Sequence, residues 1–221
     1  MIEELLPPGV AVVEMLADPP GVVLFPEEEK LLGQAVEKRR VEFTTVRHCA
    51  RLAFAQLGVP PAPILPGEYG APRWPEGVVG SMTHCAGYRA AAIARSVDIV
   101  TVGVDAEPHE ALPPEVLNAV TLPEERGRLA KLAATRPEVH WDRLLFSAKE
   151  SVYKSWFPLT RRWLDFEEAS IVFDLTDGEP GSFYARLLVP GPQVAGVRLS
   201  GFAGRWLVRG GLLFTAIAVT T

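Results

Sequence analysis

The sequence is short of cysteine, of net positive charge and of long apolar runs, and each shortage excludes a class of protein. Only two of its 221 residues are cysteines, which excludes a disulfide framework and favours a reducing compartment. No run approaches the roughly 20 apolar residues of a membrane span, and the start MIEELLPPGV lacks the basic and apolar parts of a secretory signal. We therefore predict a cytoplasmic protein that does not enter a membrane.

The charge balance argues against general nucleic-acid binding. The formal net charge is −5, whereas a nucleic-acid surface needs a broadly basic face. Basic residues nevertheless gather within one predicted helix, as Lys38, Arg39, Arg40, Arg47 and Arg51, with His48 among them. Such a run is typical of a solvated helix face, and it is also what a local anion site requires.

Familiar nucleotide and zinc motifs are missing as well. The chain has neither GxxxxGK[ST] nor GxGxxG. The dipeptides His48-Cys49 and His84-Cys85 invite a zinc interpretation, but adjacent side chains diverge on a helix, and no CxxC or HxxxH spacing accompanies them. We interpret both cysteines as small buried residues.

Hydrophobic periodicity predicts an α+β protein whose halves each combine helix with antiparallel strands. Six prolines mark residues 59–77 as a surface loop, and Ser147 with Glu150 has the spacing of a capping box at a helix start. The expected helices cover 26–58 (one helix, or two broken near Gly33), 122–133 and 148–157. The expected strands cover 9–16, 78–82, 88–96, 99–105, 167–175, 181–189, 201–208 and 212–221.

Two acids, Asp105 and Glu107, stand at the end of the expected strand 99–105, in VGVDAEP. Side chains two apart on a strand point to the same side, so both carboxylates would converge and would need a cation between them. Glu150 and Lys154 share a helix face in FSAKESVYKSW, which alone is typical of an ordinary surface pair. Taken together, the three carboxylates are the hard oxygen ligands that suit Mg²⁺.

A third stretch, GSMTHC, places Thr83 and His84 at the rim of a predicted strand. A lone histidine there is commonly a hydrogen-bonded edge residue. Beside Mg²⁺, however, His84, Lys154 and the arginines would supply the positive charge that a polyphosphate needs. The combination indicates metal-assisted chemistry on a phosphate-bearing ligand.

These stretches resemble a known family. GSMTHCAGYRAAAIA, VGVDAEP and FSAKESVYKSWFPLT, in this order and spacing, resemble the 4'-phosphopantetheinyl transferases of the surfactin-synthetase/enterobactin type. EKRRVEFTTVRHCAR, LGVPPAPIL and HWDRLLF are similar to its actinobacterial, mycobacterial-like branch. The resemblance covers most of residues 20–163, and the C-terminal strands are less diagnostic.

The resemblance implies a monomer of two similar α+β subdomains, which we place at residues 1–103 and 104–221, with coenzyme A in the cleft between them. It implies transfer of the phosphopantetheine arm of coenzyme A to a serine of an acyl or peptidyl carrier protein, with release of 3',5'-ADP. Such carriers serve fatty acid, polyketide or nonribosomal peptide synthesis. A non-catalytic binding module and a Mg²⁺-dependent phosphodiesterase are the alternatives.

Site roles follow from the same resemblance. It makes Asp105, Glu107 and Glu150 the ligands of Mg²⁺, for which Mn²⁺ could substitute, and it makes Glu150 the general base that takes the serine proton. Lys154 would neutralise charge on the leaving phosphate. The residues expected to hold coenzyme A are Arg39, Arg40, Arg47, Thr83, His84 and Lys154, with Phe146 and Tyr153 along the pantetheine channel.

Two further features concern ligands. Pro66 stands where close relatives carry a lysine, so one cation for the 3'-phosphate is missing or comes from elsewhere. Carrier proteins are typically acidic, so Arg161 and Arg162, after the predicted helix, are candidates for contacting them, although such residues also suit a solvated helix end.

Overall fold

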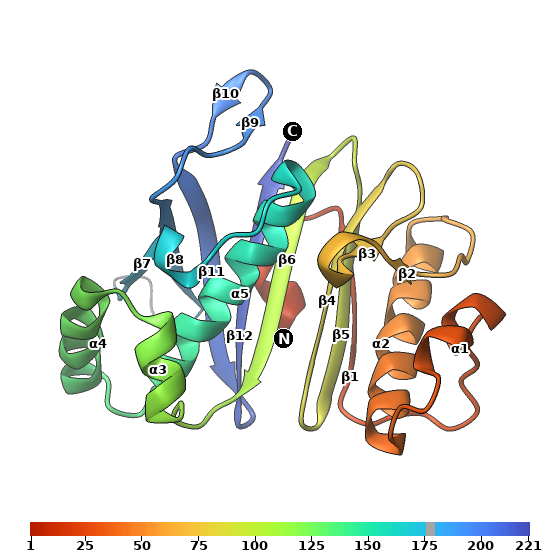
Figure 1. Ribbon diagram of the computed structural model, residues 1–221, viewed down its shortest axis with the longest axis horizontal. Helices are drawn as coiled ribbons and strands as arrows, with labels where there is room; N and C mark the ends of the chain where they lie inside the picture. The colour runs from red at the N-terminus through yellow and green to blue at the C-terminus, as the bar shows by residue number, and fades with distance from the viewer. Residues whose placement is uncertain (176–179) are drawn as a thin grey trace.

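The computed structural model describes residues 1–175 and 180–221, which form two large sheets, each covered by a long helix, and two short two-stranded ribbons (Figure 1). The helices are α1 (Pro26–Leu32), α2 (Glu37–Gln56), α3 (Pro114–Val120), α4 (Pro123–Thr135) and α5 (Trp141–Thr160), with the short 3-10 turns η1 (Ile2–Leu5), η2 (Glu68–Gly70) and η3 (Phe166–Glu168). The strands are β1 (Val10–Met15), β2 (Leu65–Pro66), β3 (Pro72–Arg73), β4 (Val78–Cys85), β5 (Tyr88–Arg95), β6 (Ile99–Pro108), β7 (Ala169–Asp174), β8 (Gly181–Leu187), β9 (Gln193–Val194), β10 (Val197–Arg198), β11 (Gly201–Arg209) and β12 (Leu212–Thr220).

The first unit is a three-stranded antiparallel sheet in the order β1-β5-β4, with α2 packed on it. A small side chain on β5 lets the helix approach closely, because Ala91 packs in the same core cluster as Ala50 and Ala53 of α2. The helix buries a stripe at 3–4 residue spacing against this surface. The stripe consists of Phe43, Val46, Ala50, Ala53 and Phe54.

The second unit is a five-stranded antiparallel sheet in the order β6-β12-β11-β8-β7, with α5 across one face. Alternate residues of its strands point inward and meet an apolar face of the helix. Trp141 packs edge-on against Trp206 at 5.2 Å between ring centroids. The core also contains Leu144, Leu145, Val152, Trp156, Phe173, Phe183 and Phe202.

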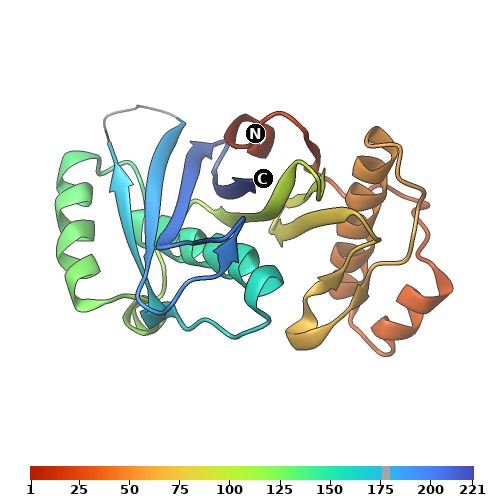
Figure 2. The same cartoon turned by 90° about the horizontal axis from the view of Figure 1, so that it is seen from above.

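The two units meet where β4 lies beside β6, at the centre of the molecule in both views (Figures 1 and 2). Side chains make this connection: the Ser81 hydroxyl accepts a hydrogen bond from the Val104 amide, and the Thr83 hydroxyl accepts one from the Ala106 amide, each at 3.1 Å. Strand β6 pairs with β12 from Ile99 onward. The exact division at residue 103 stays a prediction.

The structure confirms the α+β class and most of the expected elements. The predicted helical stretch over residues 26–58 is two helices, and the first ends at Gly33, whose φ of 45° suits glycine. The strands expected in the C-terminal third are all present as β7, β8, β11 and β12. Within residues 59–77, the only regular structure is the short pair β2–β3 with the turn η2. Among the described residues, no helix combines the length and apolarity needed to cross a membrane.

Three local predictions are wrong. Ser147 does not begin a helix: α5 starts at Trp141, and Ser147 is buried, sharing a 2.9 Å hydrogen bond with the Thr215 hydroxyl. Strand β6 continues through Glu107 to Pro108, because β12 pairs with it over that length. Cys49 is buried as expected, but Cys85 is only partly buried at the end of β4.

Candidate active site

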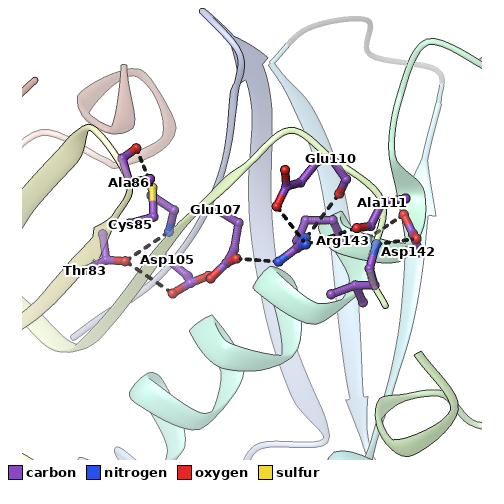
Figure 3. Close-up of polar contacts among 11 residues, drawn as sticks. Thr83, Cys85, Ala86, Asp105, Glu107, Glu110, Ala111, Asp142 and Arg143 are labelled. Atoms are coloured by element: carbon purple, nitrogen blue, oxygen red, sulfur yellow. Dashed lines mark hydrogen bonds and ion pairs between the residues drawn. The ribbon is translucent and has the colours of Figure 1, made fainter. Parts of the chain in front are cut away.

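Asp105 lies on β6 at the junction of the two units, 5% exposed. Its Oδ1 accepts a hydrogen bond from the Thr83 hydroxyl of β4 at 3.3 Å (Figure 3). Because the same hydroxyl accepts the Ala106 amide, Thr83 ties the acid to the neighbouring unit. The structure thus brings together Thr83 and Asp105, which the sequence placed on separate stretches.

Lys154 reaches Asp105 from α5. Its Nζ donates to Asp105 Oδ1 at 2.7 Å and to the Val104 carbonyl at 3.0 Å. The helix can lie this close because β6 has glycine at position 103, where an added Cβ would stand 2.2 Å from the Ser151 carbonyl oxygen. Lys154 therefore binds the strand instead of forming an ordinary surface pair with Glu150.

The other two acids share this electrostatic environment. Burial, and then the charge of Asp105, raise the pKa of Glu107 to about 7, although Arg143 and Lys154 oppose the shift. Burial and the charge of Asp105 also raise the pKa of Glu150, again opposed by Lys154. The charge of Asp105 thus disfavours the charged forms of both Glu107 and Glu150, which a divalent cation would relieve.

The chemistry of this group fits a hard divalent cation. Asp105 Oδ2 is buried and has no hydrogen-bond partner, which leaves one carboxylate oxygen for a ligand. In the conformation described for residues 1–175 and 180–221, no three His, Cys, Asp or Glu side chains converge as a metal cluster. Asp105 is instead paired with Lys154, and Glu107 with Arg143. Oxygen ligands of this kind suit Mg²⁺.

Arg143 is a site residue that the sequence reasoning missed. Its guanidinium bonds Glu107 at 3.0 Å and the carbonyls of Glu110 and Ala111 at 3.2 and 3.1 Å (Figure 3). It fixes the segment after β6 against the start of α5. The signal was available: Arg143 precedes Glu150 by seven residues, about two helical turns, so both lie on the same face.

Only one of the predicted arginines meets His84. Arg39 Nη1 lies 3.2 Å from His84 Nε2, so two groups from α2 and β4 come together at the surface. Burial is the main reason that the pKa of His84 is lowered, and Arg39 adds to the shift while Glu42 opposes it. A neutral imidazole here accepts a hydrogen bond from Arg39 through Nε2.

Arg40 and Arg47 point elsewhere. Arg40 forms an ion pair with Glu29 of α1. Arg47 is 7% exposed and lies over the Phe43 ring at 3.2 Å, donating to the Ile64 carbonyl at 3.1 Å. Burial lowers the pKa of Arg47 to about 10. Both arginines therefore help to hold the connections of the first unit together.

Phe146 and Tyr153 follow Arg143 and Glu150 along α5 at 3–4 residue spacing. The Phe146 ring lies 5.9 Å from that of Phe166. The Tyr153 ring lies 4.9 Å from that of Trp163 and 5.9 Å from that of Phe157. These contacts make an aromatic lining beside Glu150, to which the sequence reasoning contributed only Phe146 and Tyr153.

Lys149, next to Glu150, anchors the helix. Its Nζ donates to Glu125 Oε2, the Val120 carbonyl and the Phe166 carbonyl at 2.7, 2.8 and 2.7 Å, so all three ammonium protons are used. Glu125 in turn accepts the amides of Leu122 and Ile171. This buried network sets the orientation of α5.

The remaining predicted residues lie on the surface. Arg161 ends α5 with a left-handed φ of 55°, and Arg161 and Arg162 are both exposed. Pro66 is exposed on β2. Arg73 pairs in register with Leu65 beside Pro66, so the same hairpin carries a cation.

Comparison with known proteins identifies the family of the chain. Residues 27–94 match the family model of the 4'-phosphopantetheinyl transferase N-terminal domain, and residues 101–195 match the 4'-phosphopantetheinyl transferase superfamily. The chain is 57% identical to the 4'-phosphopantetheinyl transferase Svp of Streptomyces mobaraensis, over 99% of the chain and 89% of that protein. It is 51% identical to the 4'-phosphopantetheinyl transferase PptT of Mycobacterium tuberculosis, over 99% of the chain and 98% of that protein.

A more distant relative is enterobactin synthase component D of Salmonella typhi, 37% identical over 56% of the chain and 51% of that protein. These matches confirm the family that the sequence motifs indicated, and they extend the similarity beyond residues 20–163 to nearly the whole chain. The chain belongs to the 4'-phosphopantetheinyl transferase superfamily and is an enzyme of that class.

Proposed function

We propose that this enzyme moves the 4'-phosphopantetheine arm of coenzyme A onto a serine hydroxyl of an acyl or peptidyl carrier protein, in a Mg²⁺-dependent reaction. In that reaction the serine oxygen forms a bond to the phosphorus of the arm. The bond to the leaving phosphate breaks, and 3',5'-ADP departs. The single observation that carries the proposal is the junction of the units, where Asp105 keeps a buried, unpartnered oxygen beside Glu107 and Glu150.

Asp105, Glu107 and Glu150 would hold the metal. When bound, Mg²⁺ supplies charge neutralisation for a pyrophosphate, and Mn²⁺ has the oxygen preference to replace it. The raised pKa of Glu150 suits a group that accepts a proton from serine, directly or through one water. Lys154, already bonded to Asp105, is placed to offset negative charge at the same point.

The Arg39–His84 pair is the best-supported contact for a phosphate of coenzyme A. Two nitrogens from different elements meet there at 3.2 Å, and both side chains can turn to an anion. Arg40 and Arg47 would support this contact indirectly, because they hold α1 and the segment at Ile64 against α2. Arg73, next to Pro66, is the cation that can replace the lysine expected in that loop.

Phe146 and Tyr153 would line the path of the pantetheine arm, and Arg161 and Arg162 would contact an acidic carrier. We further propose that the enzyme works as a monomer and that it works in the cytoplasm. Its two free cysteines favour a reducing compartment. Light scattering of the purified protein at micromolar concentration tests the oligomeric state.

The deciding experiment is intact mass spectrometry of an apo acyl carrier protein after incubation with the enzyme, coenzyme A and Mg²⁺, with an EDTA control. A metal-dependent gain of one phosphopantetheine is the expected result, and Mn²⁺ should restore it after EDTA treatment. Release of 3',5'-ADP without a carrier protein would instead indicate a phosphodiesterase. No gain on several carrier proteins would reject the proposal.

A further inference from the structure

The tip of the β2–β3 hairpin has an unusual residue. Glu68 to Ala71 form a tight turn closed by a 3.0 Å hydrogen bond from the Ala71 amide to the Glu68 carbonyl. Both central residues have positive φ, 51° at Tyr69 and 77° at Gly70. This is the pattern of a type I′ turn, whose first central position favours Asn, Asp or Gly. Tyr69 is therefore in a backbone conformation that a bulky residue adopts only under strain.

Local strain of this kind persists when something else in the structure needs the residue. Core packing is not that need, since Tyr69 is 71% exposed. Its hydroxyl makes no hydrogen bond to any described residue either. What Tyr69 does have is two ring contacts, at 5.7 Å to Phe157 and 6.0 Å to Trp163.

Both contacts cross between the units. The hairpin belongs to the segment between α2 and β4 of the first unit, whereas Phe157 lies on α5 and Trp163 just after it. The tip of the hairpin faces the C-terminal end of α5 in both views (Figures 1 and 2). Trp163 is itself 53% exposed, so the contact between the Tyr69 and Trp163 rings lies at the surface.

The contact continues directly to the site. The Tyr153 ring lies 4.9 Å from that of Trp163, which Tyr69 also contacts, and Tyr153 follows Glu150 by three residues on α5. Glu150, Tyr153 and Phe157 follow one face of α5 at 3–4 residue spacing. The hairpin tip thus completes an aromatic wall that leads to Glu150.

We propose that Tyr69 is a substrate-positioning residue, which latches the hairpin of the first unit onto the aromatic wall of α5 and so closes one side of the path for an aliphatic, amide-bearing arm. This inference rests on the proposed function, because coenzyme A supplies such an arm. Tyr69 acts through Trp163 and Tyr153, so its effect belongs to binding of the arm.

The test compares Tyr69→Asn with Tyr69→Phe by calorimetric titration of coenzyme A and of 3',5'-ADP, which lacks the arm. Tyr69→Asn should raise the Kd for coenzyme A about threefold to tenfold, the range of one aromatic contact, and leave the Kd for 3',5'-ADP unchanged. Tyr69→Phe should bind both ligands like the wild type. Val97→Asn, at an exposed turn between β5 and β6, is the matched control.

Thermal melting separates positioning from a purely structural role. Asn accepts the left-handed backbone, so Tyr69→Asn should keep or raise the melting temperature while coenzyme A binds more weakly. A lowered melting temperature with unchanged binding would overturn the proposal. Equal weakening for both ligands would do the same, because the arm would then not be what Tyr69 positions.

Tryptophan quenching tests the latch without any ligand. Introduced into the wild-type protein, Tyr69→Asn should increase the quenching of tryptophan fluorescence by acrylamide. Introduced into a Trp163→Phe variant, it should leave the quenching unchanged. If the wild type binds neither ligand and transfers nothing, the proposed function fails, and the substrate role of Tyr69 fails with it. If the wild type transfers normally and Tyr69→Asn changes neither quenching nor binding, only the latch fails.

Discussion

At the scale of single residues, the candidate site contains Glu107 and Glu150, whose pKa values are raised by burial and by the charge of Asp105. Glu150→Gln keeps the shape of the side chain but cannot accept the serine proton. We expect transfer to fall by about 100-fold or more, with coenzyme A binding and melting temperature retained. Intact mass spectrometry of the carrier protein measures the rate. Glu115→Gln, exposed on α3, is the control, and turnover of Glu150→Gln close to that of this control would rule out the base.

His84 gives a prediction about pH. Because burial lowers the pKa of His84 below the ordinary 6.5, the unfolded chain binds a proton more readily than the folded one in the window beneath 6.5. Stability from this group is therefore present above about pH 6.5 and is lost as pH falls through the window. Urea unfolding at about pH 7.5 and pH 5.5 should show a smaller acid loss in His84→Gln than in wild type. Equal losses would show that the histidine titrates normally.

Residue patterns predicted part of the site. Strand alternation alone brings Asp105 and Glu107 to one side, and helical spacing joins Glu150 to Lys154, so these acids could be found without a structure. Tyr69 could not, because its importance comes from a turn geometry and a contact across units that local sequence does not specify. The partners of Arg40 and Arg47 also depend on how α1 packs on α2.

At the scale of elements, the buried ammonium of Lys149 fixes α5, the helix that carries Glu150 and Lys154, against its neighbours. Removing one partner of a buried ion pair leaves the other uncompensated, so Lys149→Met should lower the free energy of unfolding by about 3–5 kcal/mol. Urea titration measures it. Lys131→Met, on the exposed side of α4, should change it by less than about 0.5 kcal/mol. A loss in Lys149→Met no larger than this would mean that the network does not anchor the helix.

Element boundaries show where sequence reasoning stops. The capping-box spacing at Ser147 is real, but Trp141, Leu144 and Leu145 continue the apolar stripe toward the N-terminus, and burying them extends the helix by two turns. Likewise, β6 runs past Asp105 because its partner β12 is long enough to pair as far as Pro108. In both cases tertiary contacts outweigh a local signal.

At the scale of the whole molecule, two units share one junction, and that junction also holds the candidate site. The sequence predicted two α+β halves, a set of metal ligands and a set of residues that hold coenzyme A. It did not predict that the hydroxyls of Ser81 and Thr83 would join β4 to β6. This junction involves the candidate metal ligand directly, because Thr83 from the first unit and Lys154 from the second both bind Asp105 Oδ1. The position of the Asp105 carboxylate therefore depends on how the two units pack against each other.

The junction itself can be tested. Ser81→Ala with Thr83→Val removes the acceptors of the Val104 and Ala106 amides, and two buried N–H groups without partners cost about 2–6 kcal/mol together. We expect calorimetry to show a lower melting temperature and a transition broadened or split into two, because the sheets no longer unfold as one. Thr45→Val, at a buried threonine of α2, serves as the control for hydroxyl loss. A single sharp transition at the wild-type temperature in the double variant would show that apolar packing alone joins the units, and Asp105 would then owe its position to β6 and Lys154.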